Sequence, residues 1–383
     1  GDKMNQGIKL ELRAREELFI NLEPLQRGGV VPAESRKVAL SYIDGYSTCD
    51  YCLGTLHILK KPPICDFLME VADFLGMDDA VITHGCREAK FAIMHAITKP
   101  GQAIVMDENR HYTSYVAAER AGLKTYEVPS TGYPEFKVNP EEYVSAIEKA
   151  RKENGELPAL VLLTHVDWTY GNLVDAERVG KICQEYGVPF LLNTAYSSGR
   201  MPINGKKLLA DFITCSGHKS WAAGAGVVGI LALRDEWKDK VFKPSQRYKV
   251  KPIEILGCSA RGTSALVLMT SFPYVKERVK HWDEELEKAR WFSGQMESLG
   301  DIRQLGDKPH NHDLIRFETP VFNRIAQKHK RRGYFLYEEL LKRSIVGIKV
   351  GKTKSFDLST YGLTRELLGY VIDSFRDVIN KLS

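Results

Sequence analysis

The chain has 383 residues, of which 43% are hydrophobic and 27% charged, with a formal net charge of +5. This is the composition of an ordinary globular protein long enough for two domains, and it makes disulfides or structural metals unnecessary for folding. The mild positive charge is far from what a dedicated nucleic-acid binder usually shows, and by itself it does not indicate RNA binding. Because no apolar run approaches the roughly 20 residues that cross a membrane and the opening has no signal-peptide core, we expect a cytoplasmic protein with reduced thiols and no membrane partner.

The first 63 residues are irregular and rich in glycine and polar turns. They contain Arg27-Gly28-Gly29 and the pair Cys49-Asp50-Tyr51-Cys52. We interpret residues 1–63 as an N-terminal arm that contacts a second subunit.

Residues 64–272 alternate between strand-like and helical patterns. Short apolar strands are expected at 80–83, 103–106, 124–128, 159–163, 189–192, 212–214 and 227–233. Helical patterns lie at 63–77, 87–98, 112–121, 140–153 and 175–186. This alternation of strands and helices predicts a large α/β domain with a mainly parallel, seven-stranded sheet. Ligands of such sheets bind at the carboxyl ends of the strands.

Residues 273–383 predict a smaller C-terminal α+β domain. We expect a helix over 274–299, a strand at 314–318, and helices at 322–343 and 364–382. Basic clusters lie at 328–332, 349–354 and 247–251, and taken singly they are typical of solvated faces. Three cysteines in apolar periodic segments are expected in the core: Cys65, Cys183 and Cys215.

The most informative motif is Ser216-Gly217-His218-Lys219, which directly follows an apolar strand. A lysine on a tight turn at the sheet edge is partly desolvated, and the resulting fall in its pKa is what Schiff-base chemistry with pyridoxal phosphate (PLP) needs. The tetrapeptide alone is equally compatible with an ordinary surface lysine.

Other strand ends supply the remaining parts of a PLP site. Gly85-Cys86-Arg87 ends one strand and opens a helix, where free amides cradle a phosphate and Arg87 is placed for a bound anion. His111 and Tyr112 follow the next strand. His111 is the candidate for the aromatic ring that stacks on the cofactor, although a lone loop histidine is more often a bystander.

The partner of the pyridine nitrogen is open between two residues. Asn193 ends one strand and Asp167 ends another. An amide can hydrogen-bond the nitrogen but cannot keep it protonated as a carboxylate does, so Asn193, which we prefer, implies a weaker electron sink.

With these residues in view, most of the chain resembles the O-phosphoseryl-tRNA(Cys):cysteinyl-tRNA(Cys) synthase family, PLP enzymes of the aspartate-aminotransferase-like fold type I. The resembling segments are 19–29, 85–88, 111–113, Asn193 with Tyr196 and 199–202, and 216–219, together with Cys49, Cys52 and Cys258. Cys86 departs from the alanine expected in the family, which matters little if its backbone amide binds the phosphate.

The resemblance implies PLP-dependent β-replacement, in which a sulfur nucleophile displaces the phosphate of phosphoseryl-tRNA(Cys). Lys219 would carry the cofactor and the Cα proton, and Arg87, His111 and Tyr112 would bind the substrate phosphate. The cofactor would be bound by Cys86, Arg87, His111, Asn193, Ser216, Gly217, His218 and Lys219. A homodimer and a phosphoseryl-tRNA synthetase are the implied protein partners.

The resemblance also gives Cys49, Cys52 and Cys258 a common catalytic role in handling sulfur. Three thiolates suit an iron–sulfur cluster with an open position or a persulfide relay, but not a four-ligand zinc site. Two rival functions remain: a cysteine desulfurase or related PLP lyase acting on free amino acids, and a catalytically silent relative that binds tRNA or a synthetase.

Overall fold

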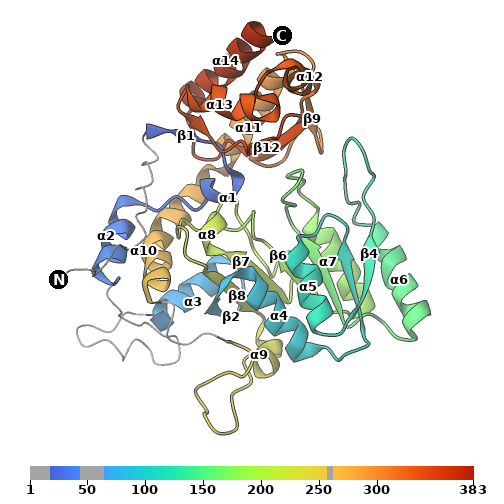
Figure 1. Cartoon of the computed structure of the whole chain (residues 1–383). Coiled ribbons are helices and arrows are strands. Elements are labelled where there is room, and N and C mark those ends of the chain that lie inside the picture. Colours follow the sequence, from blue (N-terminus) through green and yellow to red (C-terminus); the bar gives the residue numbers. More distant parts are fainter. Residues whose placement is uncertain (1–17, 44–63, 257–261) are drawn as a thin grey trace, which may run out of the picture.

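The computed structural model describes residues 18–43, 64–256 and 262–383, which form a large α/β body and a smaller C-terminal body (Figure 1). The large body is built on a seven-stranded sheet in the order β2-β8-β7-β6-β5-β3-β4. Its strands are β2 (Asp79–Thr83), β3 (Ala103–Asp107), β4 (Lys124–Val128), β5 (Leu160–Thr164), β6 (Phe190–Asn193), β7 (Phe212–Ser216) and β8 (Gly229–Leu233). Strand β8 runs antiparallel to both of its neighbours, β2 and β7, and the remaining pairs are parallel, so the expected mainly parallel sheet is confirmed.

Helices cover both faces of this sheet, which explains why its central strands are continuously apolar. Every residue of β5, with the sequence LVLLT, is buried. One face packs against α4 (Gly85–Ile97), α5 (Tyr112–Arg120) and α9 (Asp235–Val241). The other packs against α3 (Ile64–Phe74), α6 (Glu142–Asn154), α7 (Ala176–Tyr186) and α10 (Gly262–Arg278).

The C-terminal body, at the top of Figure 1, has a core of its own beside an antiparallel sheet in the order β12-β10-β9. Its strands are β9 (Arg303–Leu305), β10 (Leu314–Glu318) and β12 (Ser355–Ser359), and its helices are α11 (Trp282–Glu297), α12 (Pro320–Lys328), α13 (Phe335–Leu341) and α14 (Arg365–Leu382).

The N-terminal segment contributes to both bodies. Strand β1 (Ile20–Asn21) pairs in parallel with β11 (Ile345–Val346), and Leu22 belongs to the core of the C-terminal body. The segment continues as α1 (Pro24–Arg27) and α2 (Ala33–Ser41), and α2 packs against α10 of the large body.

Two helices expected to be continuous are interrupted. The run 274–299 divides at a short 3-10 turn, Val279–His281, because α10 packs against the large body whereas α11 packs against the C-terminal body. The run 322–343 stops at Lys328 and resumes at Phe335 after a turn in which Arg332 has a φ of +46°. Apolar residues recur at helical spacing on both sides of each break, so the sequence pattern does not reveal where the helix is interrupted.

Of the three cysteines expected in the core, Cys183 and Cys215 are buried, but the expectation for Cys65 is wrong because its side chain is exposed. The buried residues of α3 include Ile64, Phe67 and Val71, at helical spacing. Position 65 falls between them on the opposite face. No helix in the described part of the chain is long and apolar enough to cross a membrane.

Candidate active site

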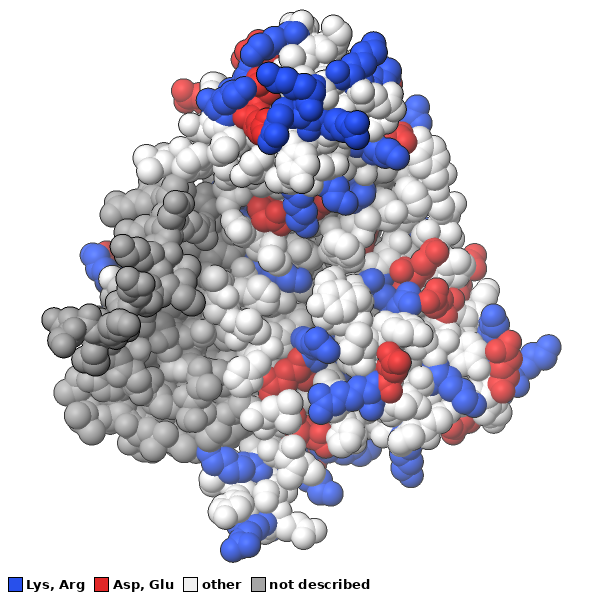
Figure 2. Space-filling view, viewed as in Figure 1, with Lys and Arg blue, Asp and Glu red and all other residues white. Residues whose placement is uncertain are grey.

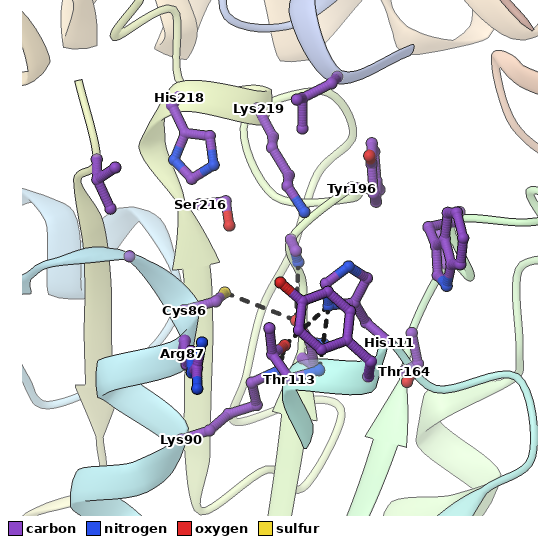
Figure 3. Close-up of a pocket in the computed structure, with 18 of the residues that line it drawn as sticks. Cys86, Arg87, Lys90, His111, Thr113, Thr164, Tyr196, Ser216, His218 and Lys219 are labelled. Carbon is purple, nitrogen blue, oxygen red and sulfur yellow. Dashed lines mark hydrogen bonds between the residues drawn. The ribbon is translucent and has the colours of Figure 1, made fainter. Parts of the chain in front are cut away.

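The carboxyl ends of the parallel strands meet around a cavity of about 490 Å³ (Figure 3). Lys219 enters it from the turn after β7, opposite Arg87 and Lys90, which come from α4. The cavity is lined by Leu25, His84, Gly85, Cys86, Arg87, Lys90, His111, Tyr112, Thr113, Thr164, Val166, Trp168, Asn193, Ala195, Tyr196, Ser216, His218, Lys219 and Val227.

Lys219 lies on the four-residue helix α8 (Gly217–Ser220), directly after β7. Its Nζ is 4.8 Å from the centroid of the Tyr196 ring. Burial lowers the pKa of Lys219, and the nearby Arg200 guanidinium acts in the same direction. An amine that loses its proton more readily is a better nucleophile towards an aldehyde, so this lysine has the environment that Schiff-base chemistry requires.

Gly28 and Gly29 hold the lysine turn through backbone contacts. The carbonyl of Gly28 accepts a hydrogen bond from the amide of Ala222 at 3.0 Å. A Cβ atom at Gly28 would lie 2.3 Å from the carbonyl oxygen of Lys219, and one at Gly29 would lie 2.1 Å from that of His218. The Arg27-Gly28-Gly29 motif therefore contains glycines because the chain passes too close to the lysine turn for a side chain.

The fully buried side chain of Arg200 also holds the lysine turn in place. Arg200 pairs with Asp313 of the C-terminal body at 2.6 Å, and its Nη2 donates to the carbonyls of Lys219 at 3.0 Å and Pro24 at 3.1 Å. Although burial opposes it, Arg200 holds the pKa of Asp313 below 3.8, so the pair is ionised. This one side chain joins the N-terminal segment, the lysine turn and the C-terminal body.

The start of α4 is shaped to hold an anion. Gly85 has a φ of +83°, a conformation that lets the chain turn directly from β2 into the helix. Arg87 is exposed at the cavity and makes no ion pair with any residue of 18–43, 64–256 and 262–383. A cation at the positive end of a helix is unfavourable by itself, so both features fit a bound phosphate.

His111 caps the N-terminus of α5, where its Nδ1 accepts from the backbone N–H of Thr113 at 3.3 Å. Burial lowers the pKa of His111 to about 3, with further contributions from Lys219 and Lys90, so the ring is neutral. Its centroid is 4.3 Å from that of Tyr112. The neutral ring faces the cavity as a flat surface against which an aromatic ligand can stack.

The two candidates for the pyridine nitrogen have different surroundings. Asn193 lines the cavity, and its Oδ1 accepts from the N–H of Ala195 at 3.2 Å and from the thiol of Cys86 at 3.7 Å. Asp167 is absent from the lining. Its carboxylate instead caps a turn, accepting from the amides of Thr169, Tyr170 and Asn172.

Of the other predicted residues, Ser216, His218 and Tyr112 line the cavity, whereas Gly217 does not. A Cβ at Gly217 would lie 2.7 Å from the side chain of Val228, so this glycine serves the packing of the turn. Cys49, Cys52 and Cys258 lie outside the described residues. Within residues 18–43, 64–256 and 262–383, no group of three or more His, Cys, Asp or Glu could hold a metal ion.

Sequence reasoning missed Lys90, which is 1% exposed and lines the cavity. It lies one helical turn after Cys86, and a lysine on the apolar side of a helix is the signal that could have revealed it. Among the described residues that line it, the cavity thus contains Arg87, Lys90 and Lys219 but no Asp or Glu. Such a site attracts ligands with more than one negative charge.

Known proteins were compared with the chain in sequence and structure. The family model described as O-phosphoseryl-tRNA(Sec) selenium transferase, SepSecS, matches residues 91–379. The O-phospho-L-seryl-tRNA:Cys-tRNA synthase of Methanocaldococcus jannaschii is 54% identical over 94% of this chain and 95% of its own. The crystal structure of a SepCysS–SepCysE N-terminal domain complex is 52% identical, covers 97% of both chains and has a TM-score of 0.90.

A cysteine desulfurase from Thermococcus onnurineus NA1 has a TM-score of 0.70 at 19% identity, covering 98% of this chain and 100% of its own, and shares the fold alone. The expected fold type I architecture is therefore confirmed. Identity above 50% over nearly the whole length, together with the family-model match, confirms the resemblance found in the sequence. The chain belongs to the O-phospho-L-seryl-tRNA:Cys-tRNA synthase family.

Proposed function

We propose that this enzyme converts O-phosphoseryl-tRNA(Cys) to cysteinyl-tRNA(Cys) by PLP-dependent replacement of the substrate phosphate with sulfur. The observation that carries the proposal is the cavity itself, in which a partly buried lysine faces two further cations and, in the part of the chain that the structure describes, no carboxylate. A cofactor phosphate and a substrate phosphate together supply the negative charge that such a cavity lacks.

The residues fit PLP at each end of the cofactor. Its phosphate would lie against the free amides at the start of α4, near Ser216 and His218, and Asn193 would reach the pyridine nitrogen. Lys219 would hold PLP until the substrate amine takes its place, and the cofactor would then supply an electron sink that acidifies the Cα–H of the amino acid. His111 offers the face on which the ring would stack.

The chain's own side chains account for the rest of the reaction. The Nζ of Lys219 is the proton carrier, because its lowered pKa lets it accept the Cα proton and return it. Arg87, His111 and Tyr112 all line the cavity, and they would hold the substrate phosphate as it leaves Cβ. A sulfur nucleophile then forms the new bond at the same carbon.

The tRNA body would be bound by a basic face on the C-terminal body. Two clusters separated in sequence come together there, since a Cβ at Gly333 would lie 3.2 Å from the Cα of Gly351. The basic face is formed by exposed side chains of Lys328, Lys330, Arg331, Arg332, Lys349, Lys352 and Lys354. Figure 2 shows Lys and Arg side chains gathered on the C-terminal body at the top of the view.

Three further parts of the proposal rest on the sequence and the family. We infer a homodimer in which the N-terminal arm, residues 1–63, reaches towards the partner's cofactor, and a phosphoseryl-tRNA synthetase that delivers the substrate. Cys49, Cys52 and Cys258, named here the cysteine trio, would hold sulfur as a persulfide or on an iron–sulfur cluster.

The decisive experiment incubates the protein with phosphoseryl-tRNA(Cys), PLP and sulfide and then identifies the amino acid on the tRNA. Cysteine should appear with the wild type and not with Lys219→Ala. Activity confined to free cysteine would favour a desulfurase, and colourless protein without turnover would favour a silent tRNA-binding relative. Wild-type turnover by Lys219→Ala would overturn the assignment of that lysine.

A further inference from the structure

The buried side chain of Lys90 forms hydrogen bonds with two hydroxyl groups, one of which also contacts His111. Its ammonium group donates to the hydroxyl of Thr113 at 2.6 Å and to that of Ser114 at 2.9 Å, and both partners are neutral. In the described part of the chain Lys90 makes no ion pair with a carboxylate. A buried charge without a counter-charge is costly, so a positive charge held at this place calls for a function.

While Lys90 is charged, one arrangement of donors and acceptors satisfies every group in this cluster. An ammonium group has donors and no acceptor, so the Thr113 oxygen must accept from it. The single hydroxyl proton of Thr113 is then free to donate to Nδ1 of His111, which lies 2.9 Å from that oxygen. Nδ1 also accepts from the backbone N–H of Thr113.

We propose that Lys90 is a positioning residue that acts through the Thr113 hydroxyl to keep His111 neutral, with its proton on Nε2. His111 then presents an N–H donor to the cavity and keeps a neutral face for stacking. This role rests on the proposed function. A neutral His111 with its proton on Nε2 can donate a hydrogen bond to a phosphate oxygen without transferring the proton.

The surroundings of Lys90 are consistent with a charged ammonium group that donates to Thr113. Burial lowers the pKa of Lys90 to about 8, so the amine is still protonated at neutral pH. The groups facing it are Cys86 and Arg87 from α4, Asp107 from β3 and Lys219 from α8. Discharge of Lys90 at higher pH would allow its amine to accept from Thr113 and would release Nδ1 from its hydroxyl donor.

The test is nuclear magnetic resonance of the PLP-bound, full-length protein carrying 15N-histidine, with the His111 signals assigned by loss in His111→Gln. Long-range 1H–15N spectra at pH 7 should show the wild-type ring in the Nε2–H form alone. In Lys90→Met both lone pairs of the Thr113 oxygen become available, so an Nδ1–H donating to that oxygen competes with the backbone N–H of Thr113 donating to Nδ1, and a mixture with the Nδ1–H form should appear. The double variant Lys90→Met/Thr113→Val lacks that acceptor and should return to the Nε2–H form.

Ser114→Ala is the matched control, because it removes the other partner of Lys90 without touching His111, and it should keep the wild-type spectrum. A single Nε2–H form in folded Lys90→Met, or a mixture that persists in the double variant, would overturn the proposal. If Lys90→Met does not fold, raising the pH of the wild type from 7 to 9.5 should produce the same mixture, and its absence would be equally decisive.

Activity provides a separate readout. Lys90→Met should reduce kcat/KM for phosphoseryl-tRNA by about tenfold, the loss of roughly one charge-assisted hydrogen bond. If the wild type forms no cysteinyl-tRNA while the spectra behave as expected, the proposed function fails and the role of Lys90 in fixing His111 stands.

Discussion

The strongest test of the anion site is the replacement of Arg87 by alanine and by lysine. Arg87 makes no ion pair in residues 18–43, 64–256 and 262–383, so its loss should leave folding stability nearly unchanged. A guanidinium can give a phosphate two parallel hydrogen bonds, each worth about 1.5–3 kcal/mol to a charged group. Because Arg87 is exposed, the lower value is appropriate, which gives about 3 kcal/mol for the pair.

Arg87→Ala should therefore weaken binding of a phosphorylated ligand by about 150-fold, whereas Arg87→Lys, which keeps the charge and one donor, should lose about tenfold. Calorimetry with phosphoserine and serine, and absorbance titration with PLP, would show which phosphate Arg87 holds. Arg151→Ala, on the outer surface of α6, is the control. Equal losses for phosphoserine, serine and PLP would refute the anion-binding role.

Four shorter predictions test other parts of the molecule. Gly28→Ala should destabilise the protein by about 1–3 kcal/mol in urea unfolding, since its Cβ would strike the Lys219 carbonyl, whereas Gly294→Ala, which meets nothing within 4 Å, should not. The depressed pKa of Asp313 adds stability above an unfolded value near 4 that is lost as the pH falls through the folded value, so the acid limb of a pH–stability curve should flatten in Asp313→Asn. Binding of tRNA to the basic face should weaken steeply with salt in filter-binding assays, and neutralising two of its lysines should reduce the slope by about 2. Replacing one member of the cysteine trio by alanine should abolish sulfur transfer but not PLP binding, and replacing two should cost little more; additive losses would contradict a shared role.

The sheet was predictable from sequence because its strands are short, apolar and separated by amphipathic helices. Each of the seven expected strands overlaps an observed one. The strands of the C-terminal sheet were harder to find: β10, with LIRFE, was expected, but β9 has only three residues and β12, with SFDLS, is largely polar. Pairing between distant segments such as β1 and β11 leaves no periodic signal in either strand.

The candidate site was predictable where its residues lie at the end of a strand, as Asn193 does, or in the turn after one, as Lys219 and His111 do. A parallel sheet brings its carboxyl ends to one edge, so residues in those positions meet whatever their separation in sequence. Lys90 and Arg200 do not follow strands. Lys90 reaches the cavity from the second turn of α4, and Arg200 acts on Lys219 through a backbone carbonyl, which sequence patterns do not encode.

The orientation of Asn193 bears on why phosphate would be the leaving group. Its Oδ1 is occupied by the N–H of Ala195 and the thiol of Cys86, so the group left to face a ligand is the NH2, which can only donate. A donor pairs with an unprotonated pyridine nitrogen, which draws electrons less strongly than a protonated one. A reaction that must hold negative charge at Cα for long would be slow in such a site. Phosphate at Cβ removes that need, because its departure takes up the electrons as the proton leaves, and Arg87 lies at the cavity where the departing charge can be stabilised.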